Sequence, residues 1–108
     1  MIPAPVTDAF NQQLNREMYS SYLYLALSAY GESLGLRGIA RWFLFKHQEE
    51  LAHARKFYRY LVGQEAKVAL REIAAPPAEF GGVVQAFEQT LAHERRITES
   101  IHHLVDVA

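Results

Sequence analysis

Three glutamates stand where a helix needs apolar side chains. Glu17, Glu50 and Glu94 each fall within an apolar stripe that follows the 3–4 spacing of one helix face. The stripes are Phe10, Leu14, Ser21 and Tyr24 around the first glutamate, Phe43, His47, Ala54, Phe57 and Leu61 around the second, and Phe87, Leu91, Thr98, Ile101 and Val105 around the third. An unpaired buried carboxylate costs several kcal/mol, so its burial requires an ion pair or a metal. Only Lys46 falls near these stripes, so we expect one or two divalent cations to neutralise the carboxylates.

A histidine completes a candidate metal site. His53 follows Glu50 at a spacing of three residues, which brings a carboxylate and an imidazole to the same side of a helix. Glu17 and Glu94, from the other two segments, supply further oxygens. Three carboxylates and one imidazole suit iron or manganese better than structural zinc. The sequence therefore predicts a metal centre shared by three helices.

The elements that must position these residues are three long helices. Segments rich in Ala, Leu, Glu, Gln and Arg predict helices over 6–33, 38–63 and 82–107, separated by clusters of glycine and proline. The short glycine-bearing turn after residue 33 makes the first two helices an antiparallel hairpin. Residues 64–81 carry no clear helical pattern and predict a crossover that runs the length of a bundle. We expect one all-α domain over residues 1–108.

Composition excludes several classes of protein. The chain has 11 Lys and Arg against 12 Asp and Glu, so it lacks the basic surface of a nucleic-acid binder. It has no cysteine and therefore no disulfide framework. The start does not resemble a signal peptide, and no apolar run is long enough to span a membrane. A cytoplasmic protein is expected.

Four segments carry a resemblance to a known family. They are Leu14-Asn-Arg-Glu17-Met-Tyr-Ser-Ser-Tyr, Glu49-Glu50-Leu-Ala-His53-Ala, Pro76-Pro77 and Phe87-Glu-Gln-Thr-Leu-Ala-His-Glu94. Together they resemble the bacterial non-haem ferritins over essentially the whole chain. The resemblance implies a ferritin-like helical bundle that oxidises Fe²⁺ to Fe³⁺ with O₂ or H₂O₂, for iron storage or detoxification. Other divalent metals could substitute for iron in binding.

The resemblance also implies a set of ligands. Glu17, Glu50 and His53 would hold a first iron. Glu50 would bridge to a second iron, with Glu94 as a further ligand of that ion. Tyr24 matches the family's tyrosine beside the centre, which hydrogen-bonds a ligand or gives an electron; the alternative is that Tyr24 only packs in the core.

Neighbouring residues receive separate interpretations. Glu49 matches an outer carboxylate that helps bind a third iron in some bacterial members, or else it lies on a solvated helix face. His47 is expected to pack or to support a ligand. The second Glu-x-x-His, Glu99 and His102, falls on the polar side of its helix, and His93 is interpreted as a surface residue.

The sequence departs from the family in one large respect. A ferritin subunit continues into a fourth helix, and these 108 residues end after the third. Three amphipathic helices alone expose a long apolar trough, which monomers rarely tolerate. We therefore expect a homo-oligomer in which another chain supplies the fourth wall; the alternative is a piece of a longer ferritin.

Two other functions stay open from the residues alone. One is a rubrerythrin-type di-iron peroxidase, although such a centre carries a second Glu-x-x-His and here the extra copy faces away. The other is a non-catalytic ferritin remnant or assembly protein.

Overall fold

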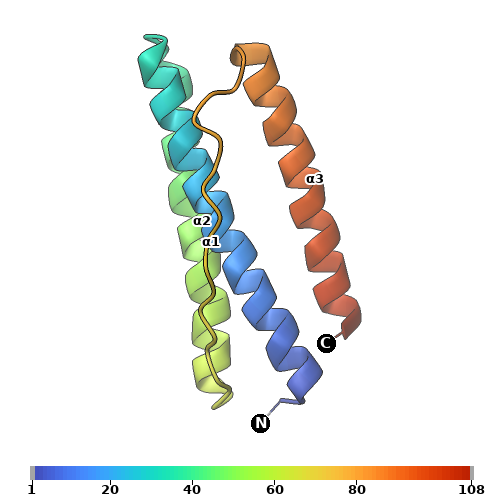
Figure 1. The fold of residues 1–108 in the computed structure, drawn as a ribbon. Coiled ribbons are helices and arrows are strands. Elements are labelled where there is room, and N and C mark those ends of the chain that lie inside the picture. The colour runs from blue at the N-terminus through green and yellow to red at the C-terminus, as the bar shows by residue number, and fades with distance from the viewer. Residues whose placement is uncertain (1, 108) are drawn as a thin grey trace.

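The chain forms a rod of three long helices (Figure 1). The computed structural model describes residues 2–107 and measures 49 × 21 × 21 Å along its principal axes. The helices are α1 (Ala4–Ser33), α2 (Arg37–Gly63) and α3 (Val83–Val107). No strand occurs within residues 2–107, which confirms the all-α prediction. Helix α1 begins earlier than residue 6 because Pro5 is tolerated in a first turn, where its missing N–H would have no partner.

Helices α1 and α2 form the expected antiparallel hairpin. Gly35 adopts a φ of 72°, and the N–H of Leu36 donates to the carbonyl of Gly31 at 2.9 Å, a pattern that ends a helix cleanly. Gly31 also allows close helix packing, because a Cβ built there would lie 3.2 Å from the backbone nitrogen of Ala40. The two helices are therefore held in contact directly beside the turn.

Residues 64–82 form the long crossover and run beside the hairpin (Figure 1). The side chain of Asn11 fixes this segment on α1: its Nδ2 donates to the carbonyl of Lys67 at 2.9 Å, and its Oδ1 accepts from the N–H of Ala69 at 2.8 Å. At the far end, Phe80 is buried and meets Tyr30 edge-on at 5.3 Å between ring centroids. The crossover thus delivers α3 to the opposite end of the hairpin.

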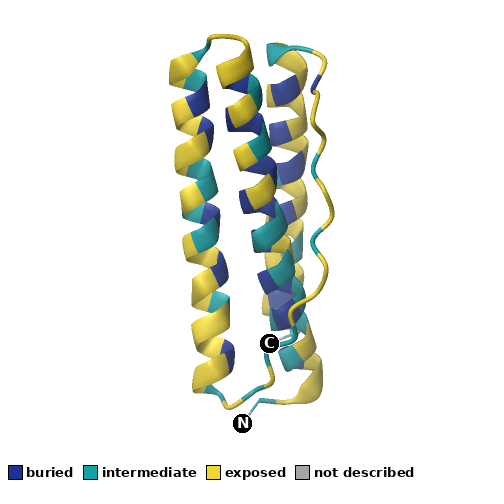
Figure 2. Cartoon of the chain, turned by 60° about the vertical axis from the view of Figure 1, so that its left-hand side comes forward, coloured by how far each residue is buried: buried dark blue, intermediate teal, exposed yellow. Residues whose placement is uncertain are grey.

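Helix α3 packs on α1, whereas the backbones of α2 and α3 are not in contact within the described residues. The buried side chains of α3 are Ala86, Thr90, His93, Ile97 and Leu104. The stripe that the sequence predicted to be buried is largely exposed instead, including Leu91 at 55% and Val105 at 68%. Figure 2 shows buried and exposed residues alternating along this helix.

That prediction was wrong for a physical reason. Helix α3 buries the polar side chains of Thr90 and His93 on the same face as Ile97 and Leu104. Other apolar side chains, such as Leu91 and Val105, stay exposed, and α2 makes no backbone contact with this helix. Hydropathy alone selects the more apolar stripe, but the packing partner selects the buried one.

Among residues 2–107, two apolar clusters hold the elements together. One is built on Leu23, Tyr24, Leu27, Phe43, Phe80 and Ala86, and the other on Leu14, Ala54 and Leu61. Glu17 and Glu50 lie between them in sequence and are themselves buried. No helix among the described residues is long and apolar enough to cross a membrane.

Candidate metal site

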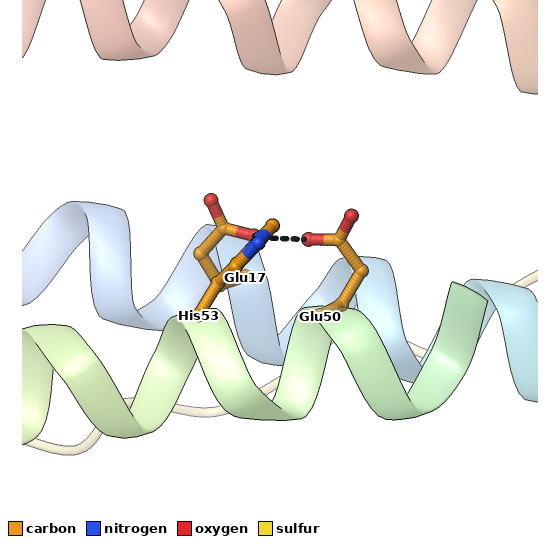
Figure 3. Close-up of side chains that lie close together, drawn as sticks. All are labelled: Glu17, Glu50 and His53. Atoms are coloured by element: carbon orange, nitrogen blue, oxygen red, sulfur yellow. Dashed lines mark ion pairs between the residues drawn. The ribbon is translucent and has the colours of Figure 1, made fainter. Parts of the chain in front are cut away.

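Glu17, Glu50 and His53 form a group of potential metal ligands, here called the triad. Helix α1 contributes Glu17 and helix α2 contributes the other two, one turn apart. One ligand atom from each side chain lies within 4.8 Å of the other two. Figure 3 shows the three side chains pointing toward one another from the two helices. The hairpin alone therefore assembles the triad.

The distances within the triad suit a shared ion. His53 Nδ1 lies 3.4 Å from Glu50 Oε2 and 3.7 Å from Glu17 Oε2. Two ligand atoms that are each about 2.1 Å from one metal, at a tetrahedral angle, are about 3.4 Å apart. The triad is thus close to coordination geometry without a change of backbone.

The same oxygens have no other partner. Glu17 and Glu50 are 1% and 4% exposed, and in the described residues Oε2 of each is buried without a hydrogen bond. Native proteins satisfy nearly all buried polar atoms, so an orphaned carboxylate oxygen indicates an absent partner. A cation between them would satisfy both oxygens at once.

The burial of two neighbouring carboxyl groups changes the pKa of Glu50. Burial, followed by the neighbouring carboxyl of Glu17, raises the pKa of Glu50 from its ordinary 4.5 to about 8, while His53 acts in the opposite direction. At neutral pH the metal-free triad therefore retains a proton on Glu50. A divalent ion would displace that proton, because positive charge stabilises the carboxylate.

Gln13 holds Glu17 in place, and sequence reasoning missed it. Its side chain is fully buried, and its Nε2 donates to Glu17 Oε1 at 3.2 Å. This bond leaves Glu17 Oε2 directed to the triad. The spacing of four residues before Glu17 was the available signal, since it places both side chains on one helix face.

The structure places Glu94 and Glu49 outside the triad. Glu94 Oε1 accepts a hydrogen bond from the hydroxyl of Tyr24 and lies 3.8 Å from Lys46 Nζ. Glu49 Oε1 lies 3.9 Å from the same ammonium. We call Lys46, Glu49 and Glu94 the lysine cluster; Tyr24 borders it.

Tyr24 lies between the two groups. It is fully buried, and burial, followed by its bond to Glu94, raises its pKa, so its hydroxyl stays protonated and donates. The charges of Glu50 and Glu17 raise this pKa further, although less than burial and Glu94 do, so Tyr24 lies within electrostatic reach of both groups.

The other histidines have structural contacts. His47 Nδ1 donates to the carbonyl of Ser21 at 2.6 Å and ties α2 to α1, which fits its expected packing role. His93 is only 4% exposed, so its interpretation as a surface residue was wrong. Its Nε2 is 2.7 Å from Ser20 Oγ. Since that hydroxyl already donates to the carbonyl of Arg16, it accepts from His93.

Burial, followed by the charge of Arg96, lowers the pKa of His93, so its ring is neutral at pH 7. The sequence signal for the burial of His93 was its spacing, three residues after Thr90 and four before Ile97, which places the three side chains on one helix face. Glu99 and His102, the second Glu-x-x-His, are both exposed on α3, as expected.

An apolar cavity gives access to the triad. It has a volume of about 390 Å³, and Glu17 and His53 form part of its wall. Its other lining residues are Phe10, Lys56, Phe57, Tyr60 and Ile101. Because the His53 side chain is 46% exposed, the imidazole is the accessible member of the triad.

Comparison with known proteins gives a consistent result. The family described as ferritin-like domain matches residues 7–108. A bacterial non-heme ferritin of Bacteroides fragilis is 34% identical over 100% of this chain and 68% of its own length. The protein of the same name from Staphylococcus aureus is 28% identical over 100% of this chain and 65% of its own length.

Solved structures agree in fold. An engineered closed form of the Archaeoglobus fulgidus ferritin is 38% identical, with a TM-score of 0.96 over 100% of this chain and 66% of that one. A humanized archaeal ferritin gives a TM-score of 0.97 at 37% identity, over 100% and 66% of the two chains. The present chain thus spans about two thirds of the length of these relatives.

Proposed function

Because this chain belongs to the ferritin-like family, we propose that it binds Fe²⁺ at the triad and oxidises it to Fe³⁺. One observation carries the proposal: two buried carboxylate oxygens without partners converge with an imidazole nitrogen. The ligand types support iron. Hard anionic oxygens favour Fe³⁺ over Fe²⁺, and one imidazole keeps affinity for the ferrous ion.

A second ion is part of the proposal. Glu50 would bridge two ions, and Glu94 from α3 would bind the second. The charge of Glu94 acts on Glu50, which supports their proximity. Glu49 would be an outer ligand, and Tyr24 would hold Glu94 through its hydroxyl. In this arrangement α3 completes a centre that the hairpin begins.

The redox chemistry needs an external oxidant and no organic cofactor. Two Fe²⁺ ions give up one electron each, and with two protons they reduce O₂ to H₂O₂, or H₂O₂ to two waters. The oxidant would reach the ions through the cavity beside His53. The proton displaced from Glu50 by the incoming ion is available at the place where oxygen is reduced.

The test is stopped-flow absorbance after Fe²⁺ is mixed with the aerated protein. Glu50→Ala and His53→Ala each remove one of the three triad ligands. We expect oxidation at least about a hundredfold slower, because loss of a residue that only supports a metal ligand already costs about 10–100-fold in activity. Glu99→Ala and His102→Ala are matched controls, because they change the same residue pair at the same spacing on an exposed surface. The controls should oxidise iron as the parent does.

Two outcomes would overturn the proposal. Triad variants that oxidise iron as fast as the parent would show that the triad is not the site. Absence of bound iron after anaerobic loading of the parent would favour a non-catalytic protein instead.

Assembly with further copies of the chain is also proposed. Bulky apolar side chains are exposed along α2 and α3, among them Phe45, Leu91 and Val105 at 61%, 55% and 68%. Large apolar surface that is exposed in a single chain is typical of interfaces. Analytical ultracentrifugation should show a homo-oligomer that Leu91→Glu weakens; a stable monomer of the parent would contradict the proposal.

A further inference from the structure

The ammonium of Lys46 lies at a point where four electron-rich groups meet. It is 3.8 Å from Glu94 Oε1 and 3.9 Å from Glu49 Oε1. It is also 5.8 Å from the ring centre of Tyr24 and 5.9 Å from that of Trp42. Carboxylates and aromatic faces both attract cations.

This environment is only partly open to water. The Lys46 side chain is 24% exposed, and Tyr24, which borders it, is fully buried. The Tyr24 hydroxyl donates to the same Glu94 oxygen that faces the ammonium. That hydrogen bond holds the Glu94 carboxylate in one position. The ammonium of Lys46 therefore faces a carboxylate that the fold fixes, and not one that moves freely on the surface.

The triad differs in this respect. In the described residues, Glu17 and Glu50 have no lysine or arginine within ion-pair distance, and their inner oxygens lack partners. The carboxylates on the two sides of the centre are therefore in different states. The triad lacks a cation, whereas the lysine cluster already contains one, the ammonium of Lys46.

We propose that Lys46 is a built-in counter-ion that occupies the position of the second divalent ion. This inference rests on the proposed function and adds an order of loading to it. The first ion enters the triad without displacing any protein cation. The second must move the ammonium away from Glu94 before that carboxylate can bind it, so the second ion binds more weakly than the carboxylates alone would allow.

Zinc titration by calorimetry tests this, because Zn²⁺ binds without redox chemistry. Lys46→Gln removes the charge and keeps a polar side chain of similar reach. We expect the second equivalent of Zn²⁺ to bind about tenfold or more tightly in this variant, since a partly buried charge pair is lost as a competitor. The first equivalent should keep its affinity.

Three further variants sharpen the result. Arg55→Gln removes a positive charge from an exposed position of the same helix and should leave both affinities unchanged. Lys46→Arg keeps the charge and should keep the second equivalent weak. Lys46→Met removes the charge and leaves an apolar side chain, and it should tighten the second equivalent as Lys46→Gln does. It replaces Lys46→Gln in the test if circular dichroism shows that Lys46→Gln folds poorly.

The outcomes separate the two claims. If Lys46→Gln and Lys46→Met bind the second equivalent no more tightly than the parent, the counter-ion role is wrong, while a first equivalent that depends on His53 still supports the proposed function. If neither the parent nor the variants bind any Zn²⁺, both claims are overturned. If Arg55→Gln tightens the second equivalent equally, the effect is one of overall charge and the specific role of Lys46 fails.

Discussion

The triad and the lysine cluster are both built from carboxylates, yet they are neutralised in different ways. Glu17 and Glu50 are buried and leave inner oxygens without partners, and Glu50 retains a proton because its pKa is raised to about 8. Glu94 is more exposed, accepts a hydrogen bond from the hydroxyl of Tyr24 and faces the ammonium of Lys46. A carboxylate that lacks an internal partner is ready for an external cation, and one that has a partner must first be released. The two groups can be separated by experiment.

The largest expected effect is a pH dependence of stability that the triad produces and the lysine cluster does not. Between pH 4.5 and 8 the folded protein holds a proton on Glu50 that the unfolded chain has released. At Glu50 the unfolded state then binds fewer protons, so the contribution of Glu50 to stability falls as pH rises through this window and levels off above about pH 8. Below about pH 6.5 His93, whose pKa is lowered, acts in the opposite direction, so the fall is clearest between pH 6.5 and 8. The slope is at most about 1.4 kcal/mol per pH unit.

Urea unfolding in the presence of EDTA measures this slope. Glu50→Gln cannot ionise at this position and should lose the dependence, whereas Glu94→Gln should retain it. A parent protein whose stability is flat from pH 6.5 to 8 would show that Glu50 is not held in its protonated form.

The next effect is stabilisation by metal. A ligand that binds only the folded state at a hundred times its dissociation constant adds about 2.7 kcal/mol to the free energy of unfolding. Zn²⁺ at that level should stabilise the parent and Glu94→Gln by similar amounts and Glu50→Gln far less. Thermal melts with and without Zn²⁺ measure this stabilisation. If Glu50→Gln and Glu94→Gln lose it equally, the triad and the lysine cluster do not differ in metal binding.

Tyr24→Phe should produce a smaller loss that is confined to the lysine cluster. The substitution removes a hydroxyl that donates to a charged carboxylate, and a hydrogen bond of this kind contributes about 1.5 kcal/mol. Chemical denaturation should show that loss, while the first equivalent of Zn²⁺ binds as before. Loss of the first equivalent in Tyr24→Phe would mean that the tyrosine supports the triad as well.

Glu49→Gln should have the smallest effect. Its ion pair with Lys46 spans 3.9 Å on the surface of one helix, and the Glu49 side chain is 41% exposed. Such pairs contribute no more than about 0.5 kcal/mol. A loss of stability well above that value would show that the lysine cluster is coupled more tightly than its exposure indicates.

The hairpin and its two buried glutamates were predictable from spacing. Glu17 and Glu50 lie on stripes that are buried in the structure, because α1 and α2 pack on each other with the faces that hydropathy identifies. Iron as the substrate ion and the roles of Tyr24 and Glu94 stay predictions. What the structure adds is the close approach of the three triad side chains.

The face of α3 was not predictable in the same way. Thr90 and His93 are buried although they are polar, since each has a hydrogen bond on that side: Thr90 to the carbonyl of Ala86 and His93 to Ser20. The Thr90 bond is made within α3, whereas the His93 bond depends on a partner helix that hydropathy cannot identify. The contact of Lys46 with Glu94 likewise joins two helices, and residue spacing within one helix carries no information about it.

The origin of the triad in a single hairpin bears on local opening. Helix α3 is attached to the hairpin mainly through α1, so its backbone amides should exchange with solvent sooner than those of α1 and α2. When α3 lifts away, Glu17, Glu50 and His53 keep their mutual positions, whereas Glu94 departs from both Tyr24 and Lys46. A transient opening of α3 would therefore disrupt the lysine cluster and leave the triad intact.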